Sequence, residues 1–178
     1  ALMKEYHKWA DFQYEWHQTS IASIKNMEFP FDYRPGQKQL VSDVYRTILR
    51  RKNLFIQAPT GTGKTVSVLF PAVRAVGEEQ GEKIFYLTAK TVTATVAMET
   101  FAVFRAHGYR GKVVQITAKE KLCKCEKPEC NPDACPYAKG HYDRINDAVF
   151  DIITHENIIN RQTIEEYARK HRVCPFEF

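Results

Sequence analysis

Eight consecutive residues, A-P-T-G-T-G-K-T from Ala58 to Thr65, have the types and spacing of a phosphate-binding loop. The two glycines allow the backbone to curl so that successive N–H groups point into one concavity, and a following helix adds its positive dipole end. In such a loop Lys64 neutralises the β- and γ-phosphates, and the Thr65 hydroxyl holds Mg²⁺. A glycine-rich turn with a chance lysine is the plainer alternative, but apolar runs at 53–57 and 66–70 supply the strand–turn–helix context. We therefore predict that a nucleoside triphosphate is bound by Ala58, Pro59, Thr60, Gly61, Thr62, Gly63, Lys64 and Thr65.

A second candidate site is a group of cysteines, Cys123, Cys125, Cys130, Cys135 and Cys174. The stretch that holds the first four is rich in prolines and charges, so a bound metal centre would have to organise it. Four thiolates can hold either tetrahedral zinc or an iron–sulfur cluster. The spacing lacks the C-x₂-C pair of zinc ribbons and does not decide between the two metals. Unligated thiols remain the third possibility.

Composition limits the classes of protein to consider. The 178 residues suit one domain or one and a half, and no apolar run approaches the length of a membrane span. An odd number of cysteines beside a phosphate loop, with no signal sequence at the N-terminus, argues for a reducing cytoplasm and against a disulfide framework. The net charge of +5 permits a polyanionic partner without requiring one.

Helical periodicity and breakers divide the region before the loop. The periodicity of residues 1–28 predicts a helix, most simply one that packs on a hydrophobic core. The prolines and the glycine of 29–36 end this helix. A second helix is predicted over 37–52. Arg34 and Gln37 therefore lie shortly before the loop, and a glutamine amide can pair with both the donor and the acceptor of an adenine edge, which favours ATP over GTP. Glutamine at the start of a helix is more often simply solvated.

Strands predicted over 53–57, 84–87 and 112–116 alternate with helices, including one over 92–107, which indicates an α/β fold with a parallel sheet. Ligands bind at the carboxyl ends of such strands, where Thr88, Lys90 and Thr91 follow one strand and Lys119 another. Hydroxyls and lysines placed there suit a phosphodiester backbone, although ordinary strand-end polarity explains them equally well. Later helices are predicted over 143–153 and 164–171, the second capped by Thr163 with Glu166, and this helix returns Cys174 towards the earlier cysteines.

Together these residues resemble the iron–sulfur superfamily 2 DNA helicases, the DinG and XPD group, most closely the bacterial DinG-like members. The resemblance covers residues 29–178 and is carried by the phosphate loop, by 33–37, by 87–91, and by 121–123 with the later cysteines. It implies a RecA-like P-loop NTPase domain with a cysteine-rich iron–sulfur insertion that carries a [4Fe–4S] cluster. It also implies an ATP-dependent 5′-to-3′ motor on single-stranded DNA, serving repair or replication.

Carried over by position, the resemblance assigns adenine to Gln37, phosphate and Mg²⁺ to Lys64 and Thr65, and DNA to Thr88, Lys90 and Thr91, with Lys119 beside the cluster. It makes Cys123, Cys130, Cys135 and Cys174 the cluster ligands and leaves Cys125 surplus, unless Cys125 replaces Cys123. The implied domains are a helix at 1–28 that could end a preceding domain, the first part of motor domain 1 at 29–118, and the cluster domain at 119–178.

The acidic D-E-A-H-type motif that such motors need for hydrolysis does not occur in the sequence, and Asp151 is only a chance imitation inside a helical pattern. We therefore expect the chain to be the N-terminal part of a cytoplasmic, monomeric helicase, able to bind ATP but not to hydrolyse it at a useful rate. Two alternatives are a phosphate-loop enzyme of another class with a structural zinc knob, and a binding module with a vestigial nucleotide site.

Overall fold

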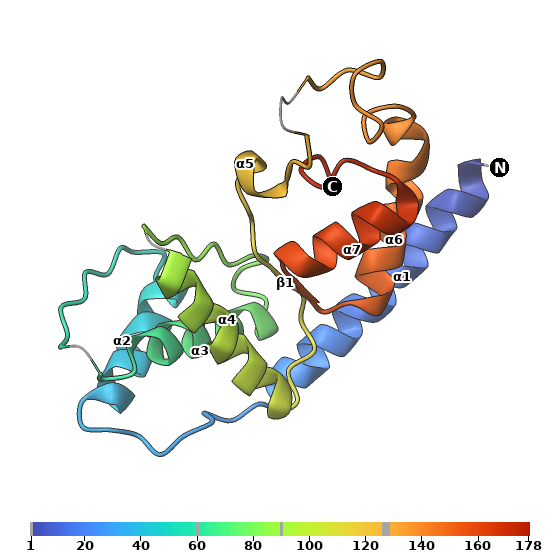
Figure 1. The fold of residues 1–178 in the computed structure, drawn as a ribbon. Helices are drawn as coiled ribbons and strands as arrows, with labels where there is room; N and C mark the ends of the chain where they lie inside the picture. The colour runs from blue at the N-terminus through green and yellow to red at the C-terminus, as the bar shows by residue number, and fades with distance from the viewer. Residues whose placement is uncertain (1, 60, 90, 126–128) are drawn as a thin grey trace. The chain divides into compact units, whose positions relative to one another are not determined.

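The computed structural model describes residues 2–59, 61–89, 91–125 and 129–178, without the side chains of Thr91 and Val92. The chain divides into two compact units, one formed by residues 13–111 and the other by residues 1–12 together with 112–178. Figure 1 shows the elements of both units along the chain. Helix α1 (Leu2–Lys25) contributes its first half to one unit and its second half to the other. The domain boundaries predicted at residues 28 and 118 remain predictions.

The unit of residues 13–111 is built from the second half of α1 and helices α2 (Gln37–Leu49), α3 (Lys64–Gly77) and α4 (Thr91–Ala106). Each of these helices lies where the periodicity of the sequence predicts one. Helix α3, which follows the phosphate loop, buries one side chain after another: Val66, Ser67, Leu69, Phe70, Pro71, Val73 and Ala75. Because α3 is buried on most sides, it fixes the position of the loop at its N-terminus.

Contacts to α1 anchor the C-terminal end of α3. Ile24 is 1% exposed, and a Cβ atom added to Gly77 would overlap its side chain, so the two helices meet without room for another methyl group. Arg74 donates hydrogen bonds to the carbonyl oxygens of Lys25 (3.1 Å) and Met27 (3.3 Å), which lie at the C-terminal end of α1 and just beyond it. These bonds satisfy carbonyls that the ending helix leaves unpaired.

An unbroken series of aromatic contacts ties the loop after α1 to α3 and α4. The ring of Phe29 stacks on Tyr33 (centroids 4.3 Å apart) and meets Phe70 edge-on at 5.3 Å. Phe70 in turn contacts Phe104, which is completely buried in α4. Edge-to-face arrangements of this kind are favourable beyond the area they bury.

Two of the three predicted strands are absent from the described residues. The segments 53–57 and 84–87 have no regular hydrogen-bonded structure, and Phe55 and Leu87 are 95% and 88% exposed. The prediction of strands there is wrong for this structure, because a strand needs a neighbour to pair with and neither segment finds one among the described residues. The expected parallel sheet is therefore reduced to two short strands in the other unit.

The other unit contains those strands, β1 (Val113–Val114) and β2 (Ile158–Ile159), which pair in parallel with Val113 opposite Ile158. Helices α5 (Lys119–Leu122), α6 (His141–His155) and α7 (Arg161–His171) complete it. Strand β1 lies inside the predicted strand 112–116, whereas β2 was not predicted. The Lys112 ammonium group fixes the pairing by donating to the Glu156 carbonyl (2.7 Å) and to the Asn157 side chain (2.9 Å).

Small apolar clusters hold α6 and α7 together. Ala148, Ala168 and Val173 form one cluster and Ile152, Ile159 and Tyr167 the other. The first half of α1 packs on the same helix α6, where Trp9 and Phe12 meet the Phe150 ring edge-on at 5.1 and 5.7 Å.

Asp151, the chance imitation of an acidic motif, has a structural role in α6. Its carboxylate accepts hydrogen bonds from Lys170 and His171 of α7, both at 2.6 Å. The bond from Lys170, followed by that from His171, lowers the pKa of this carboxyl from its usual value. Asp151 therefore joins two helices, and it belongs to the unit that does not contain the phosphate loop.

Helix α7 begins three residues earlier than predicted and has a different cap. The side chain of Asn160 accepts a hydrogen bond from the Thr163 N–H group at 3.0 Å, so Asn160 is the N-cap and Thr163 lies within the first turn. The predicted Thr163–Glu166 capping box is wrong because asparagine is at least as good a cap as threonine and stands first. Among the described residues, no helix has both the length and the apolar character needed to cross a membrane.

Candidate nucleotide and cysteine sites

The phosphate loop has the glycine-dependent backbone that its sequence predicts. Gly61 and Gly63 adopt left-handed conformations (φ 81° and 72°), and α3 begins immediately afterwards at Lys64. At Gly63 a side chain is excluded for a second reason, since an added Cβ would lie 2.5 Å from Nε2 of Gln37. Because the first N–H groups of a helix have no intrahelical partner, the start of α3 offers the donors that an anion site requires. Thr60 lies outside the described residues.

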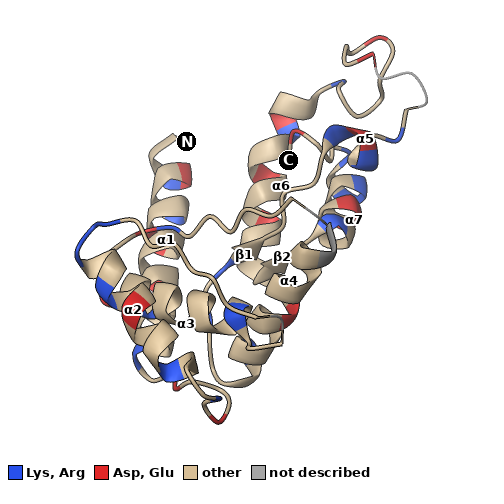
Figure 2. Cartoon of the chain, turned by 90° about the vertical axis from the view of Figure 1, so that its left-hand side faces the viewer, with Lys and Arg blue, Asp and Glu red and all other residues tan. Residues whose placement is uncertain are grey.

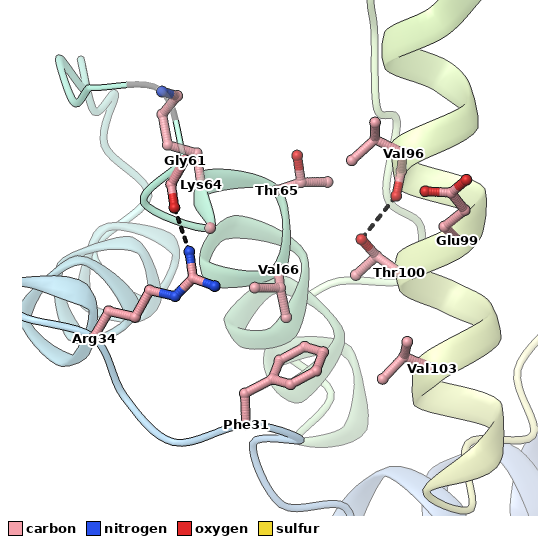
Figure 3. A pocket seen from close by; sticks show the side chains of 11 residues that line it. Phe31, Arg34, Gly61, Lys64, Thr65, Val66, Val96, Glu99, Thr100 and Val103 are labelled. Carbon is pink, nitrogen blue, oxygen red and sulfur yellow. Dashed lines mark hydrogen bonds between the residues drawn. The ribbon is translucent and has the colours of Figure 1, made fainter.

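Arg34 and Gln37, predicted from their position before the loop, both contact it. The Arg34 guanidinium donates to the carbonyl oxygen of Gly61, as the dashed line in Figure 3 shows. Gln37 is only 5% exposed, and its side-chain oxygen accepts a hydrogen bond from the Arg34 N–H group at 3.0 Å. In this structure Gln37 supports the loop from behind, and its pairing with adenine stays a prediction.

Lys64 and Thr65 are the first two residues of α3. The Lys64 ammonium donates to the carbonyl oxygens of Ala58 (2.8 Å) and Pro59 (2.6 Å). Pro59 also accepts a bond from the Thr62 hydroxyl at 2.9 Å. The lysine thus closes the loop on itself, and binding a phosphate would require it to exchange these two carbonyls for phosphate oxygens.

A cavity of about 490 Å³ opens in front of the loop, between α3 and α4. Figure 3 shows its walls: Arg34 and Phe31 come from the segment before α2, Thr65 and Val66 from α3, and Val96, Glu99, Thr100 and Val103 from α4. No sequence pattern pointed to Phe31 or Glu99, because each enters the site only through the packing of distant elements. Phe31 offers an exposed aromatic face on which a base can stack, and Glu99 is the one carboxylate among the lining residues.

All five cysteines line a second cavity, of about 380 Å³, in the unit of residues 1–12 and 112–178. Cys123, Cys125, Cys130 and Cys135 come from the segment after α5, and Cys174 comes from the turn after α7. All five thiols are free. The sulfur atoms of Cys125 and Cys135 are 3.8 Å apart, and the Cys123 sulfur lies 3.9 Å from the carbonyl oxygen of Cys125.

The polar surroundings of these thiols differ. Desolvation disfavours the Cys135 thiolate, but hydrogen bonds from the backbone of Ala138 and Tyr137 outweigh it and lower the Cys135 pKa. The hydrogen bond to Cys135, together with burial, raises the pKa of Cys125 to about 11. A hydrogen bond to Cys130 raises the pKa of the Lys119 ammonium. Cys135 is thus the thiol of this pair better suited to act as a thiolate ligand.

His141 was not predicted as a site residue, yet it lines the cysteine cavity and is only 5% exposed. Its Nδ1 atom accepts a hydrogen bond from the backbone N–H of Cys174 at 3.1 Å. Arg144 binds the same segment by donating to the carbonyl oxygens of His171 (3.0 Å) and Arg172 (2.6 Å). Two side chains of α6 therefore hold the segment that ends at Cys174, which lies 33 residues after His141 in the sequence.

Within the described part of the chain, no three His, Cys, Asp or Glu side chains lie close enough together to hold a single metal ion. The five thiols stand around the cysteine cavity. Thiols are donors that either zinc or an iron–sulfur cluster can use, so the donor set fits both kinds of centre.

The structure describes only some of the residues that were predicted to face DNA. Thr88 is half-buried and has partners of its own, Lys90 lies outside the described residues, and Thr91 is the first residue of α4 without a described side chain. Lys119 lies in α5 and lines the cysteine cavity, with its ammonium group 5.4 Å from the centre of the Phe176 ring. Figure 2 shows α5 as a short basic element.

The sequence profile of the DEAD/DEAH box helicases matches residues 34–150, which include the whole phosphate loop. The chain belongs to the DEAD/DEAH box helicase family. Membership in this family implies a P-loop NTPase fold and the use of ATP and Mg²⁺. The matched region begins at Arg34, whose guanidinium contacts the loop.

Individual relatives are all helicases. An "ATP-dependent DNA helicase DinG" of Salmonella typhimurium is 40% identical over 68 residues, which are 37% of this chain and 9% of that protein. The DinG protein of Escherichia coli K12 is 38% identical over the same length. A "Probable ATP-dependent helicase" of Methanocaldococcus jannaschii is 36% identical over 114 residues, which are 63% of this chain and 17% of that protein. The chain thus spans a small part of the length of these relatives, and no solved structure matches it.

Proposed function

We propose that this helicase-family chain is the ATP-binding part of an iron–sulfur DNA helicase of the DinG and XPD group, acting on single-stranded DNA in the cytoplasm. The observation that carries the proposal is the gathering of five cysteines, including one from beyond α7, around one cavity in a chain that also holds a phosphate loop. The 40% identity to DinG over 68 residues supports the same group.

In the nucleotide site, each residue has a task that its position allows. Phe31 stacks on the base, and the N–H groups at the start of α3 bind phosphate oxygens. Lys64 leaves the Ala58 and Pro59 carbonyls to neutralise the β- and γ-phosphates, and the Thr65 hydroxyl binds Mg²⁺. Because no D-E-A-H-type motif occurs in the sequence, these 178 residues by themselves bind ATP without rapid turnover.

In the cysteine site, Cys123, Cys130, Cys135 and Cys174 are the ligands that we assign to a [4Fe–4S] cluster. The cluster holds the proline-rich segment in shape, and Lys119 partly offsets the negative charge of the thiolates. Cys125 is left out because its sulfur is 3.8 Å from that of Cys135. Two thiolates on one tetrahedral ion at about 2.3 Å lie about that far apart, whereas thiolates on different corners of a cluster lie further apart.

For the DNA strand, we propose Thr88, Lys90, Thr91 and Lys119 as contacts to phosphates, with 5′-to-3′ movement in the intact motor. Cation–phosphate contacts make affinity fall steeply with salt, whereas stacking of bases on aromatic side chains persists. Binding of single-stranded DNA that weakens at least tenfold between about 50 and 200 mM salt would support these contacts.

Metal and sulfide analysis after anaerobic purification tests the proposal directly. We expect about four irons and about four acid-labile sulfides per chain, with a visible absorption band that Cys130→Ser removes and Cys125→Ser retains. Zinc without sulfide would overturn the cluster assignment. That result would favour the second candidate, a phosphate-loop protein of another class with a zinc knob, for which the 3.8 Å spacing of Cys125 and Cys135 is the supporting observation.

A further inference from the structure

The sulfur atoms of Cys125 and Cys135 are 3.8 Å apart, and both thiols are free and half-buried in the wall of the cysteine cavity. The proposed cluster uses Cys135 and not Cys125, so the function assigned above leaves this contact unexplained. The two residues are separated by only nine others in the chain, and the connecting backbone therefore loses little entropy when the sulfurs meet.

We propose that Cys125 and Cys135 are an oxidation site: a hydroperoxide converts the pair to a disulfide when no metal centre is bound. The disulfide itself requires only the observed contact. Its consequence rests on the proposed function, because Cys135 in a disulfide has no thiolate to offer and the cluster cannot be loaded.

Bond formation requires only a small rearrangement. A disulfide holds its sulfurs about 2.05 Å apart, so the 3.8 Å separation of the two sulfurs has to shorten. Rotation of one side chain about its Cα–Cβ bond to another staggered position moves its sulfur far enough to close this difference. The Cys123 sulfur contacts the carbonyl oxygen of Cys125, and its thiol also interacts with the Cys125 thiol. Cys123 is thus the thiol that must be distinguished from Cys125 as the partner of Cys135, and Cys123→Ser and Cys125→Ser together make that distinction.

The reaction balances with a hydroperoxide as the oxidant. One thiol attacks the peroxide, so that its S–O bond forms, the O–O bond breaks, and an alcohol or water leaves; the product is a sulfenic acid. The second thiol then attacks the sulfenic sulfur, the S–S bond forms, and the oxygen leaves as water with the remaining proton. Two thiols lose two electrons in total, the peroxide gains them, and a dithiol reductant reverses the change.

Disulfide mapping on the metal-free chain tests the site. After treatment with hydrogen peroxide and alkylation of remaining thiols, cleavage after glutamate and before aspartate places Cys125, Cys130 and Cys135 on separate peptides, because Glu126, Glu129 and Asp133 stand between them. We expect a linked pair of peptides holding Cys125 and Cys135. Cys123→Ser should keep this link and Cys125→Ser should lose it. A link from Cys135 to Cys130, or no link in the wild-type chain, would overturn the proposal.

Reloading with iron and sulfide then separates this inference from the cluster assignment. Oxidised wild-type chain should accept the cluster again only after reduction with dithiothreitol. In Cys125→Ser, Cys135 loses the thiol 3.8 Å away that would trap its sulfenic acid, so further oxidation to sulfinic acid makes the loss irreversible. If both oxidised chains recover iron and sulfide binding equally after reduction, Cys125 does not protect Cys135 by trapping its sulfenic acid as a reversible disulfide. If neither chain ever binds iron and sulfide, the cluster assignment fails while the mapped disulfide stands.

Discussion

Gly63 is the position where one added methyl group should disturb the phosphate loop most. Its left-handed conformation (φ 72°) costs an alanine about 1–2 kcal/mol, and the new Cβ would lie 2.5 Å from Nε2 of Gln37. Displacing the buried Gln37 also removes its hydrogen bond to the Arg34 N–H group, worth about 1 kcal/mol. The sum is about 2.5 kcal/mol against the conformation that cradles phosphate.

In the variant, the empty loop relaxes to another conformation and must adopt the phosphate-binding conformation again when Mg²⁺–ATP binds. The free-energy cost of that conformation therefore raises the dissociation constant. At about 1.4 kcal/mol for each factor of ten, Gly63→Ala should weaken binding of Mg²⁺–ATP about 50-fold. Isothermal titration calorimetry measures the affinity, and thermal unfolding shows whether the variant is folded.

Gly61→Ala is the matched control, because Gly61 has a similar backbone (φ 81°) but no atom within 4 Å of an added Cβ. It should lose only about tenfold, the cost of the left-handed conformation alone. In a Gln37→Ala background, Gly63→Ala should also lose only about tenfold, since the clash is gone. If Gly63→Ala and Gly61→Ala weaken binding equally in the wild-type background, the Gln37 contact is refuted; if neither weakens it, the loop is not the phosphate site.

Three further outcomes are expected. Glu99→Gln should tighten ATP binding several-fold in EDTA and reduce the effect of Mg²⁺, because a carboxylate in the phosphate cavity repels the triphosphate; unchanged titrations would contradict this. Lys170 lowers the pKa of Asp151 in the folded state, so the Asp151 carboxylate contributes to the free energy of unfolding. That contribution is present above the unfolded pKa of about 3.9 and is lost as the pH falls further. Asp151→Asn should therefore make the loss of stability in acid, measured by urea unfolding, less steep. Asn160→Ala should cost about 1 kcal/mol of unfolding free energy and Glu166→Ala almost none, whereas a capping box at Thr163 would reverse that order.

The helices and the loop could be predicted because their signals are local. Apolar periodicity over 37–49 and the breakers Pro35 and Gly36 define α2 without reference to any other part of the chain. Gly61 and Gly63 likewise indicate a left-handed backbone conformation that other residues rarely adopt. Each of these features lies where the sequence predicts it.

The strands could not be predicted in the same way, because pairing is a property of two segments. Residues 53–57 and 84–87 have strand-like composition yet remain unpaired among the described residues, while 113–114 pairs with 158–159, more than forty residues away. The bonds of Lys112 to Glu156 and Asn157 set that register, and no pattern within either strand encodes them. The same reason explains why Phe31, Glu99 and His141 went unnoticed as site residues.

In the cluster site that we propose, the fold itself already holds one of the assigned ligands. The proline-rich segment alone favours a metal as its organiser, but Cys174 is already positioned by α6 and α7. His141 accepts a bond from the Cys174 N–H group, and Arg144 binds the two carbonyls of His171 and Arg172 that precede it. A ligand fixed in this way loses less entropy when a metal centre binds. Binding energy from the centre is then needed mainly by the segment from Cys123 to Cys135, and it is in this segment that a competing contact, between Cys125 and Cys135, can form.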